Sequence, residues 1–146
     1  MSSCPISNER VNERVARIVG WLVFVVALLY IVIPHPAWLA VLLADFTARS
    51  FYRPASIFAQ SAKPLAQRLG EPQIVDAAPK IFAARIGLGM TLAAIAAFIA
   101  RLPELSRGIL AVMALCAFME GAFGYCVGCK FYGIYRKLFQ KKVINR

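Results

Sequence analysis

The stretch Ile18–Ile33, IVGWLVFVVALLYIVI, contains no charged residue and is followed by Pro34-His35-Pro36. Such a run is typical of a helix that crosses the hydrocarbon core of a bilayer. Proline cannot continue a helix and restricts the residue before it, so the two prolines end this one. We therefore expect a first membrane span over residues 18–33. The short turn at His35 forces the next helix to run antiparallel.

The composition of the chain indicates that its natural solvent is lipid. Of its 146 residues, 60% are hydrophobic, and the mean hydropathy is +0.66. A soluble domain of this length has too much surface for its volume to bury so much apolar area. The net charge of +10 comes from basic residues that flank the apolar runs, so we expect anionic lipid as their partner and no nucleic acid.

The segment before the first span, residues 1–17, is mostly polar and contains Glu9 and Glu13. Its charged residues predict a short interfacial helix. The apolar run that follows lacks a small-residue cleavage pattern. We therefore interpret it as a retained anchor and not as a cleaved signal peptide.

Three further apolar runs complete the predicted fold, with spans at 37–52, 81–100 and 108–127. The second is short and carries Asp45 and Arg49, which lie four residues apart on one helical face and can pair. The alternative interpretation is a charge pair that merely ends a span, with Arg49 reaching the interface. We expect a single all-α domain over residues 1–146, an integral membrane four-helix bundle.

Two amphipathic segments flank this bundle in the sequence. Between the second and third spans, residues 55–69 have apolar positions at helical spacing with Lys63 and Arg68 among them, which predicts a helix on the membrane surface. After the last span, residues 131–144 combine aromatic and basic residues, which predicts a basic C-terminal interfacial helix.

The distribution of Lys and Arg predicts the topology. Fifteen of the 17 lie in the N-terminal segment, in the central connection with its flanks, or in the tail. The two short turns hold only Arg101 and Arg107. With four spans, the positive-inside rule places both termini in the cytoplasm.

The sequence Cys126-Val-Gly-Cys129, at the end of the last apolar run, is the strongest candidate for chemistry. In a reducing compartment such a pair favours redox cycling, catalysis or metal binding over a structural disulfide. Reactivity requires the thiolate, which Lys130 or a helix N-terminus near Cys126 would favour. Glycines around the pair predict a break in the helix at Gly124–Gly128.

The other cysteines and the histidine are weaker candidates. Cys4, beside a proline, is either a third thiol that resolves or passes on sulfur, or a residue without a role. Cys116 lies in mid-span and is expected in the core. Zinc needs four ligands, whereas Cys4 and the pair supply three and His35 is expected on the other membrane side, so we assign no metal site.

Glu120 needs a partner because an acidic group inside a span is costly. Arg85 and Arg49 are the expected partners. Its candidate roles are a proton relay beside the dithiol, contact with a quinone or an anion, or an ion pair that sets helix register.

A resemblance joins these features. Cys4-Pro5, Asn12-Glu13, residues 76–83 (DAAPKIFA) and Cys126-Val-Gly-Cys129 resemble the bacterial membrane family named domain of unknown function 4395. That family is similar to the DoxX, DoxD and MauE group of four-helix membrane proteins, whose members are tied to thiosulfate oxidation with quinone, to disulfide formation and to thiol stress. The resemblance implies a four-helix bundle in the bacterial inner (plasma) membrane with a thiol or sulfur role.

We therefore expect an inner-membrane thiol-redox or sulfur-handling protein with Cys126 and Cys129 as its catalytic pair and Cys4 as a shuttle. Its expected partner is a thioredoxin-like or rhodanese-like protein. No cofactor is assigned, and a quinone stays open as electron acceptor. One alternative is a non-enzymatic subunit or scaffold that docks a cytoplasmic partner. The other is a sulfur-anion transporter that uses Arg49, Arg85 and the cysteines, and would require a homo-oligomer.

Overall fold

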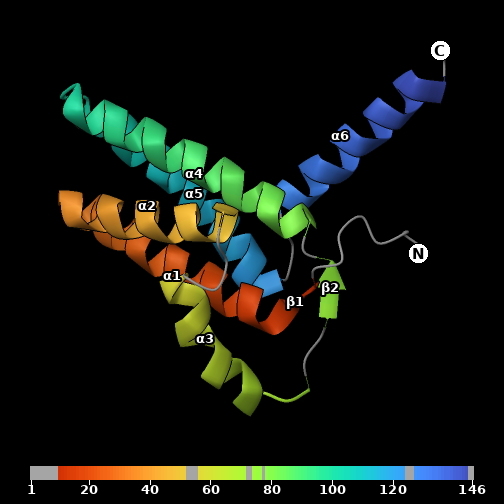
Figure 1. Cartoon of the computed structure of the whole chain (residues 1–146). Helices are drawn as coiled ribbons and strands as arrows, with labels where there is room; N and C mark the ends of the chain where they lie inside the picture. Colours follow the sequence, from red (N-terminus) through yellow and green to blue (C-terminus); the bar gives the residue numbers. More distant parts are fainter. Residues whose placement is uncertain (1–9, 52–55, 72–73, 77, 124–126, 145–146) are drawn as a thin grey trace.

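The computed structural model describes residues 10–51, 56–71, 74–76, 78–123 and 127–144. Within these ranges the chain forms six helices and one small antiparallel sheet (Figure 1). In chain order the elements are β1 (Arg10–Asn12), α1 (Glu13–Val32), α2 (Pro36–Phe51), α3 (Ile57–Arg68), β2 (Ile74–Asp76), α4 (Ala78–Ile99), α5 (Pro103–Phe123) and α6 (Val127–Ile144).

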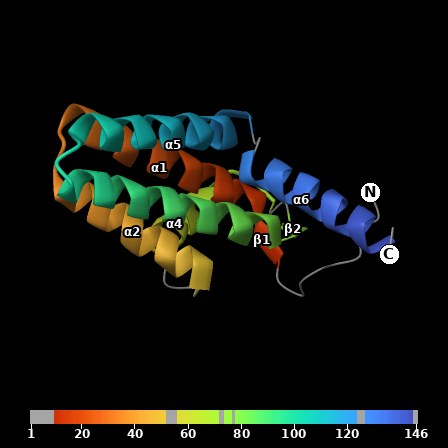
Figure 2. The same ribbon diagram turned by 90° about the horizontal axis from the view of Figure 1, so that it is seen from above.

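The helices α1, α2, α4 and α5 lie side by side as two helical hairpins. α1 packs mainly against α5, and α2 mainly against α4. Figures 1 and 2 show both short connections, α1 to α2 and α4 to α5, at the same end of this bundle. The strands, α3 and α6 lie toward the other end, so the elements outside the bundle gather at the end opposite the two turns.

Three helices of the described part are long and apolar enough to cross a membrane: Glu13–Val32, Lys80–Ile99 and Pro103–Phe123. At most a third of each is buried within the protein, and large apolar side chains such as Leu92 and Leu115 face outward. α2 has 16 residues and is therefore about 24 Å long, shorter than a hydrocarbon core of about 30 Å. The chain thus has the features of a multi-pass membrane protein. Within the described residues, three of the four predicted spans are long and apolar enough to cross a membrane, and α2 is shorter.

Small residues bring the helices of the bundle close together, as packing in lipid requires. A Cβ atom on Gly87 of α4 would overlap the ring of Phe46 on α2, and one on Gly20 of α1 would lie 3.1 Å from the Ala117 carbonyl oxygen of α5. By contrast, a Cβ atom on Gly89 would meet nothing within 4 Å. Gly87 and Thr91, four residues apart on α4, therefore face the core, whereas Gly89 faces outward.

A buried polar network joins three helices near the end with the turns. The Tyr30 hydroxyl of α1 lies 2.7 Å from Ser106 Oγ of α5, and Ser106 Oγ donates to the Ala94 carbonyl oxygen of α4 at 3.0 Å. Both side chains are fully buried. Because buried hydroxyls require partners, this network fixes the register of α1, α4 and α5.

The ends of the elements differ from the prediction in two places. Residues 10–12 form β1, paired with β2 so that Arg10 faces Asp76, where an interfacial helix was expected. Asn12 then caps α1, its Oδ1 accepting from the Arg14 amide at 3.0 Å, so the first helix begins at Glu13, before Ile18. A three-residue strand carries no periodic signal, and the sequence did not predict it.

The second difference concerns the last span, which was expected to continue to Val127. α5 ends at Phe123 and a separate helix, α6, begins at Val127. The kink predicted around Gly124–Gly128 involves residues 124–126, which lie outside the described residues. The predicted helices at 55–69 and 131–144 correspond to α3 and α6.

Candidate functional site

The candidate site is the junction between α5 and α6, where the sequence places the cysteine pair. Cys129 lies in the first turn of α6. Its side chain, together with Cys126 and Cys4, lies outside the described residues, so the structure does not report whether the three sulfurs meet. It does describe the helix ends and the charged side chains that surround the junction.

Arg17 of α1 binds the end of α5. Its Nε donates to the Gly121 carbonyl oxygen at 3.4 Å, and its terminal nitrogen donates to the Ala122 carbonyl oxygen at 3.1 Å. The last carbonyl groups of a helix lack intrahelical partners and carry partial negative charge. The guanidinium group of Arg17 offsets this negative charge at Ala122, which is four residues before Cys126 in the sequence. The end of α5 is therefore less unfavourable for a nearby thiolate than a helix end without a bound cation.

Lys80 of α4 places a second cation beside the same turn. Its Nζ lies 3.1 Å from Oε1 of Glu120, and the two side chains are 17% and 20% exposed. The partner of Glu120 is therefore Lys80. The prediction that its partner would be Arg85 or Arg49 is wrong. Arg85 is exposed on α4, and Arg49 pairs with Asp45.

The register of the α4–α5 hairpin explains this correction. From the contact between Ser106 and Ala94, fourteen residues forward along α5 lead to Glu120, and fourteen residues back along α4 lead to Lys80. Arg85 lies more than a helical turn closer to the hairpin end than Lys80 does.

Aromatic packing holds the last turn of α5 against α1. A Cβ atom on Gly121 would lie 3.0 Å from the Trp21 ring. Trp21 in turn makes edge contacts with Phe24 and Phe118, and Phe118 contacts Phe123. The residues that lead into the junction thus have little freedom to shift.

On its other side, α6 is attached to the start of α4 by ring contacts. The centroid of the Phe82 ring lies 5.4 Å from that of Tyr132 and 6.4 Å from that of Tyr135. Lys130 is exposed in the first turns of the same helix. Three basic residues thus lie on the helices around the junction: Arg17 on α1, Lys80 on α4 and Lys130 on α6.

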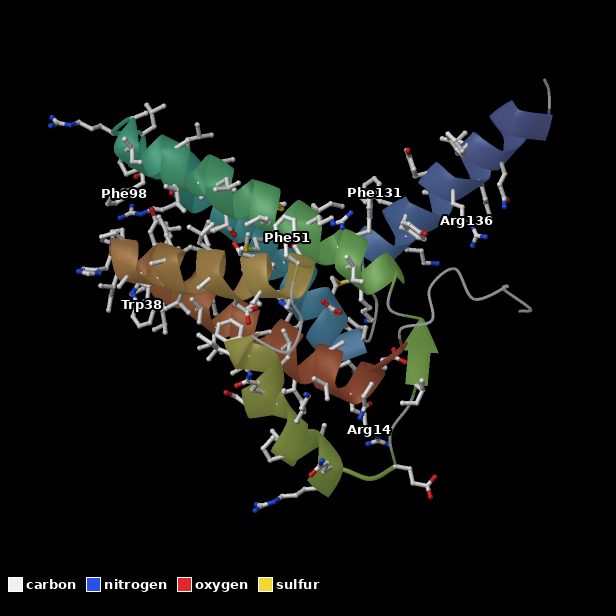
Figure 3. All side chains as sticks on the ribbon, viewed as in Figure 1. Arg14, Trp38, Phe51, Phe98, Phe131 and Arg136 are labelled. Atoms are coloured by element: carbon white, nitrogen blue, oxygen red, sulfur yellow. The ribbon has the colours of Figure 1, made fainter. Side chains whose placement is uncertain are left out.

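The amino-terminal segment enters at the same end of the molecule. β1 pairs with β2 directly before α4, and Arg14 at the start of α1 donates to the Leu69 carbonyl oxygen at 2.8 Å, just past the end of α3 (Figure 3 labels Arg14). Arg10, the first described residue, is six residues after Cys4 in the sequence.

A second polar cluster lies where α2 gives way to α3. Asp45 is fully buried and pairs with Arg49 at 2.7 Å, so the predicted pair is confirmed. Its other oxygen accepts hydrogen bonds from Ser56 Oγ at 2.6 Å and from the Phe58 amide at 3.2 Å. Asp45 therefore fixes the start of α3, a role that the spacing of Asp45 and Arg49 alone did not indicate.

Sequence reasoning missed Arg17, Lys80 and Ser56. The register argument would have found Lys80, had the α4–α5 turn been used to align the two helices. Ser56 could have been found as the N-cap of α3, since its Oγ accepts from the Ala59 amide. For Arg17 no local signal exists, because its partners lie on a distant segment. Within the described residues, no group of three His, Cys, Asp or Glu side chains is arranged to hold a metal ion.

The fold and the apolar helices define the class: a helical bundle with the features of a multi-pass membrane protein. Residues 11–137 match the family described as Domain of unknown function (DUF4395), and the chain belongs to that family. Comparisons with curated proteins and with solved structures gave no match.

Proposed function

We propose that this chain is a four-span membrane thiol-redox or sulfur-handling protein that reacts through Cys126 and Cys129. One observation supports the proposal: α6, the helix that carries Cys129, is separate from α5, and Arg17 of α1 binds the carbonyl groups at the described end of α5. Because α6 starts at Val127, Cys129 lies in its first turn. A helix N-terminus and nearby cations both favour thiolate.

The proposed chemistry is thiol–disulfide exchange. One thiolate of the pair attacks a sulfur of a partner's disulfide, forms a mixed disulfide and releases the partner's other sulfur as a thiolate. The second cysteine then attacks the mixed disulfide, which closes the Cys126–Cys129 disulfide and releases the partner's second thiolate. The partner gains the two electrons that the pair loses, and protons follow the thiolates. If a quinone is the electron acceptor in place of the partner's disulfide, it takes the two electrons together with two protons.

Cys4 is proposed as the third thiol. Its chain reach supports this role, since Cys4 is six residues before Arg10 and six residues of extended chain span at most about 21 Å. Arg10 belongs to the small sheet at the start of α4, whose first turns also carry Lys80. The partner is proposed to be a thioredoxin-like or rhodanese-like protein, and a relation to DoxX-type proteins would fit this assignment.

The proposed topology has α2 as the fourth span, with both termini in the cytoplasm of a bacterial inner membrane. Its support is the arrangement of the two hairpins, whose turns lie at one end of the bundle. Arg101 and Arg107 are the basic residues in or beside these turns. Most of the other basic residues belong to elements at the opposite end, which is the end that the positive-inside rule assigns to the cytoplasm.

The test is thiol alkylation of the full chain in nanodiscs at graded pH, with each cysteine located by mass spectrometry. We expect one thiol of the pair to react with a midpoint well below the value of about 8.5 for a free cysteine. The Cys126→Ala and Cys129→Ala variants should identify which one, and Cys116→Ala is the matched control. Thiols of the pair that react only as free cysteine does, or not at all, would exclude the proposal.

A scaffold that docks a cytoplasmic partner is the second candidate. It is favoured by the large apolar side chains that α3 exposes, Ile57 and Leu65. Sulfur-anion transport gains no such support, since Arg49 is paired with Asp45 and Arg85 is exposed on the surface of α4.

A further inference from the structure

The helix α6 carries a continuous apolar stripe that stays mostly exposed in the described part of the structure. Its members lie three and four residues apart, the spacing of one helical face. Between 56% and 64% of each side chain is exposed. They are Phe131, Ile134, Tyr135, Leu138 and Phe139.

Basic residues border this stripe on both sides. At 100° per residue, Arg136 falls on one side of it, and Lys130 and Lys137 fall on the other. No acidic residue follows Glu120 in the sequence. Figure 3 shows Phe131 and Arg136 on α6, which projects from the bundle (Figure 1).

The position of α6 restricts what can cover the stripe. α6 begins four residues after the end of α5, one of the helices long enough to span a membrane, so it starts near the boundary between hydrocarbon and water. Its contacts with the bundle are to α4 and, fewer, to α5. A second copy of α6 packed on this stripe would bring two basic borders together with no acidic side chain on α6 to offset them.

We propose that α6 lies in the headgroup layer of an anionic bilayer, with the stripe among the upper acyl chains and its basic residues among lipid phosphates. An amphipathic helix with a basic polar face binds such a surface through burial of its apolar face and through electrostatic attraction to anionic lipid. Each basic residue near the surface adds to that attraction. This inference rests on the membrane insertion of the bundle and not on the thiol chemistry.

The test measures hydrogen exchange of the α6 backbone amides in the full chain, reconstituted in nanodiscs of phosphatidylcholine alone or with about 30 mol% phosphatidylglycerol. In wild type, the anionic lipid should slow exchange in α6 by at least about tenfold. Salt of about 1 M, at which the Debye length is about 3 Å, should remove that difference. This salt response needs no variant.

A variant with Arg136→Gln, Lys137→Gln, Lys141→Gln and Lys142→Gln should exchange equally in both lipids. The matched control, Lys63→Gln with Arg68→Gln on α3, should keep the slowed exchange in α6. Equal exchange of wild-type α6 in the two lipids, persistence of the effect in high salt, or a cross-link between α6 helices of two copies would each overturn the proposal. Because a Cys126→Ser/Cys129→Ser variant should bind lipid as wild type does, failure here is distinguishable from failure of the thiol chemistry.

Discussion

At Gly87, α4 packs against α2 with no room for a side chain. The ring of Phe46 occupies the space that a Cβ atom would need. Phe46 also lies beneath the guanidinium group of Arg49, with 4.3 Å from its centroid to Cζ, so the ring is held from both sides. This packing depends on the absence of a side chain at position 87.

Gly87→Ala should therefore destabilise the protein by about 1–3 kcal/mol, the usual cost of overpacking. Gly89→Ala is the matched control on the same helix, because a Cβ atom there meets nothing within 4 Å. The control should be neutral or slightly stabilising, since alanine favours helix over glycine. Reversible denaturant unfolding in detergent micelles measures both, and equal stabilities of the two variants would contradict the account of this contact.

The Arg17 side chain contributes both to the stability of the fold and to the charge at the candidate site, because it binds the carbonyl groups at the end of α5. Replacing Arg17 with methionine, which keeps an unbranched apolar stem but removes the guanidinium group and its charge, should cost about 1 kcal/mol of unfolding free energy. The alkylation rate of the thiolate at Cys126 or Cys129 should also fall near neutral pH, because the carbonyl end of α5 would no longer be offset. Arg17→Lys should restore part of both effects, whereas an alkylation rate that does not respond to Arg17→Met would remove Arg17 from the site.

At the scale of elements, the contacts of Asp45 connect the bundle to the surface helix α3. Asp45→Asn keeps the shape but leaves Arg49 without its carboxylate partner, in a position where only 19% of that side chain is exposed. Loss of one member of a buried ion pair costs about 3–5 kcal/mol. We expect a lower unfolding free energy together with faster hydrogen exchange in the first turn of α3. Thr47→Val, on the exposed side of α2, should leave α3 unchanged.

The helices themselves were predictable because each has a strong local signal. Continuous apolar runs and prolines marked α1 and α2, and alternating apolar and basic positions marked α3 and α6. The partner of Glu120 was not predictable from depth along a span alone, since it depends on the hairpin register that the Ser106–Ala94 contact defines. The same holds for Arg17, whose partners on α5 lie far away in sequence.

For the whole molecule, the proposed topology distinguishes four spans from three. In a chain without native cysteines, single cysteines at Arg10→Cys and Lys142→Cys should be labelled by an impermeant maleimide from the same side of oriented vesicles. His35→Cys should be labelled from the other side. Labelling of Arg10→Cys and Lys142→Cys from opposite sides would mean that α2 does not cross the membrane.

The central claim is that the pair at the α5–α6 break cycles between dithiol and disulfide. It is tested most directly by equilibrating the full chain in nanodiscs with mixtures of reduced and oxidised glutathione, then mapping its cysteines by mass spectrometry. The account predicts a cooperative two-electron transition in which Cys126 and Cys129 become linked to each other while Cys116 stays a thiol. A pair that stays reduced throughout, or that only accumulates separate glutathione adducts, would contradict it.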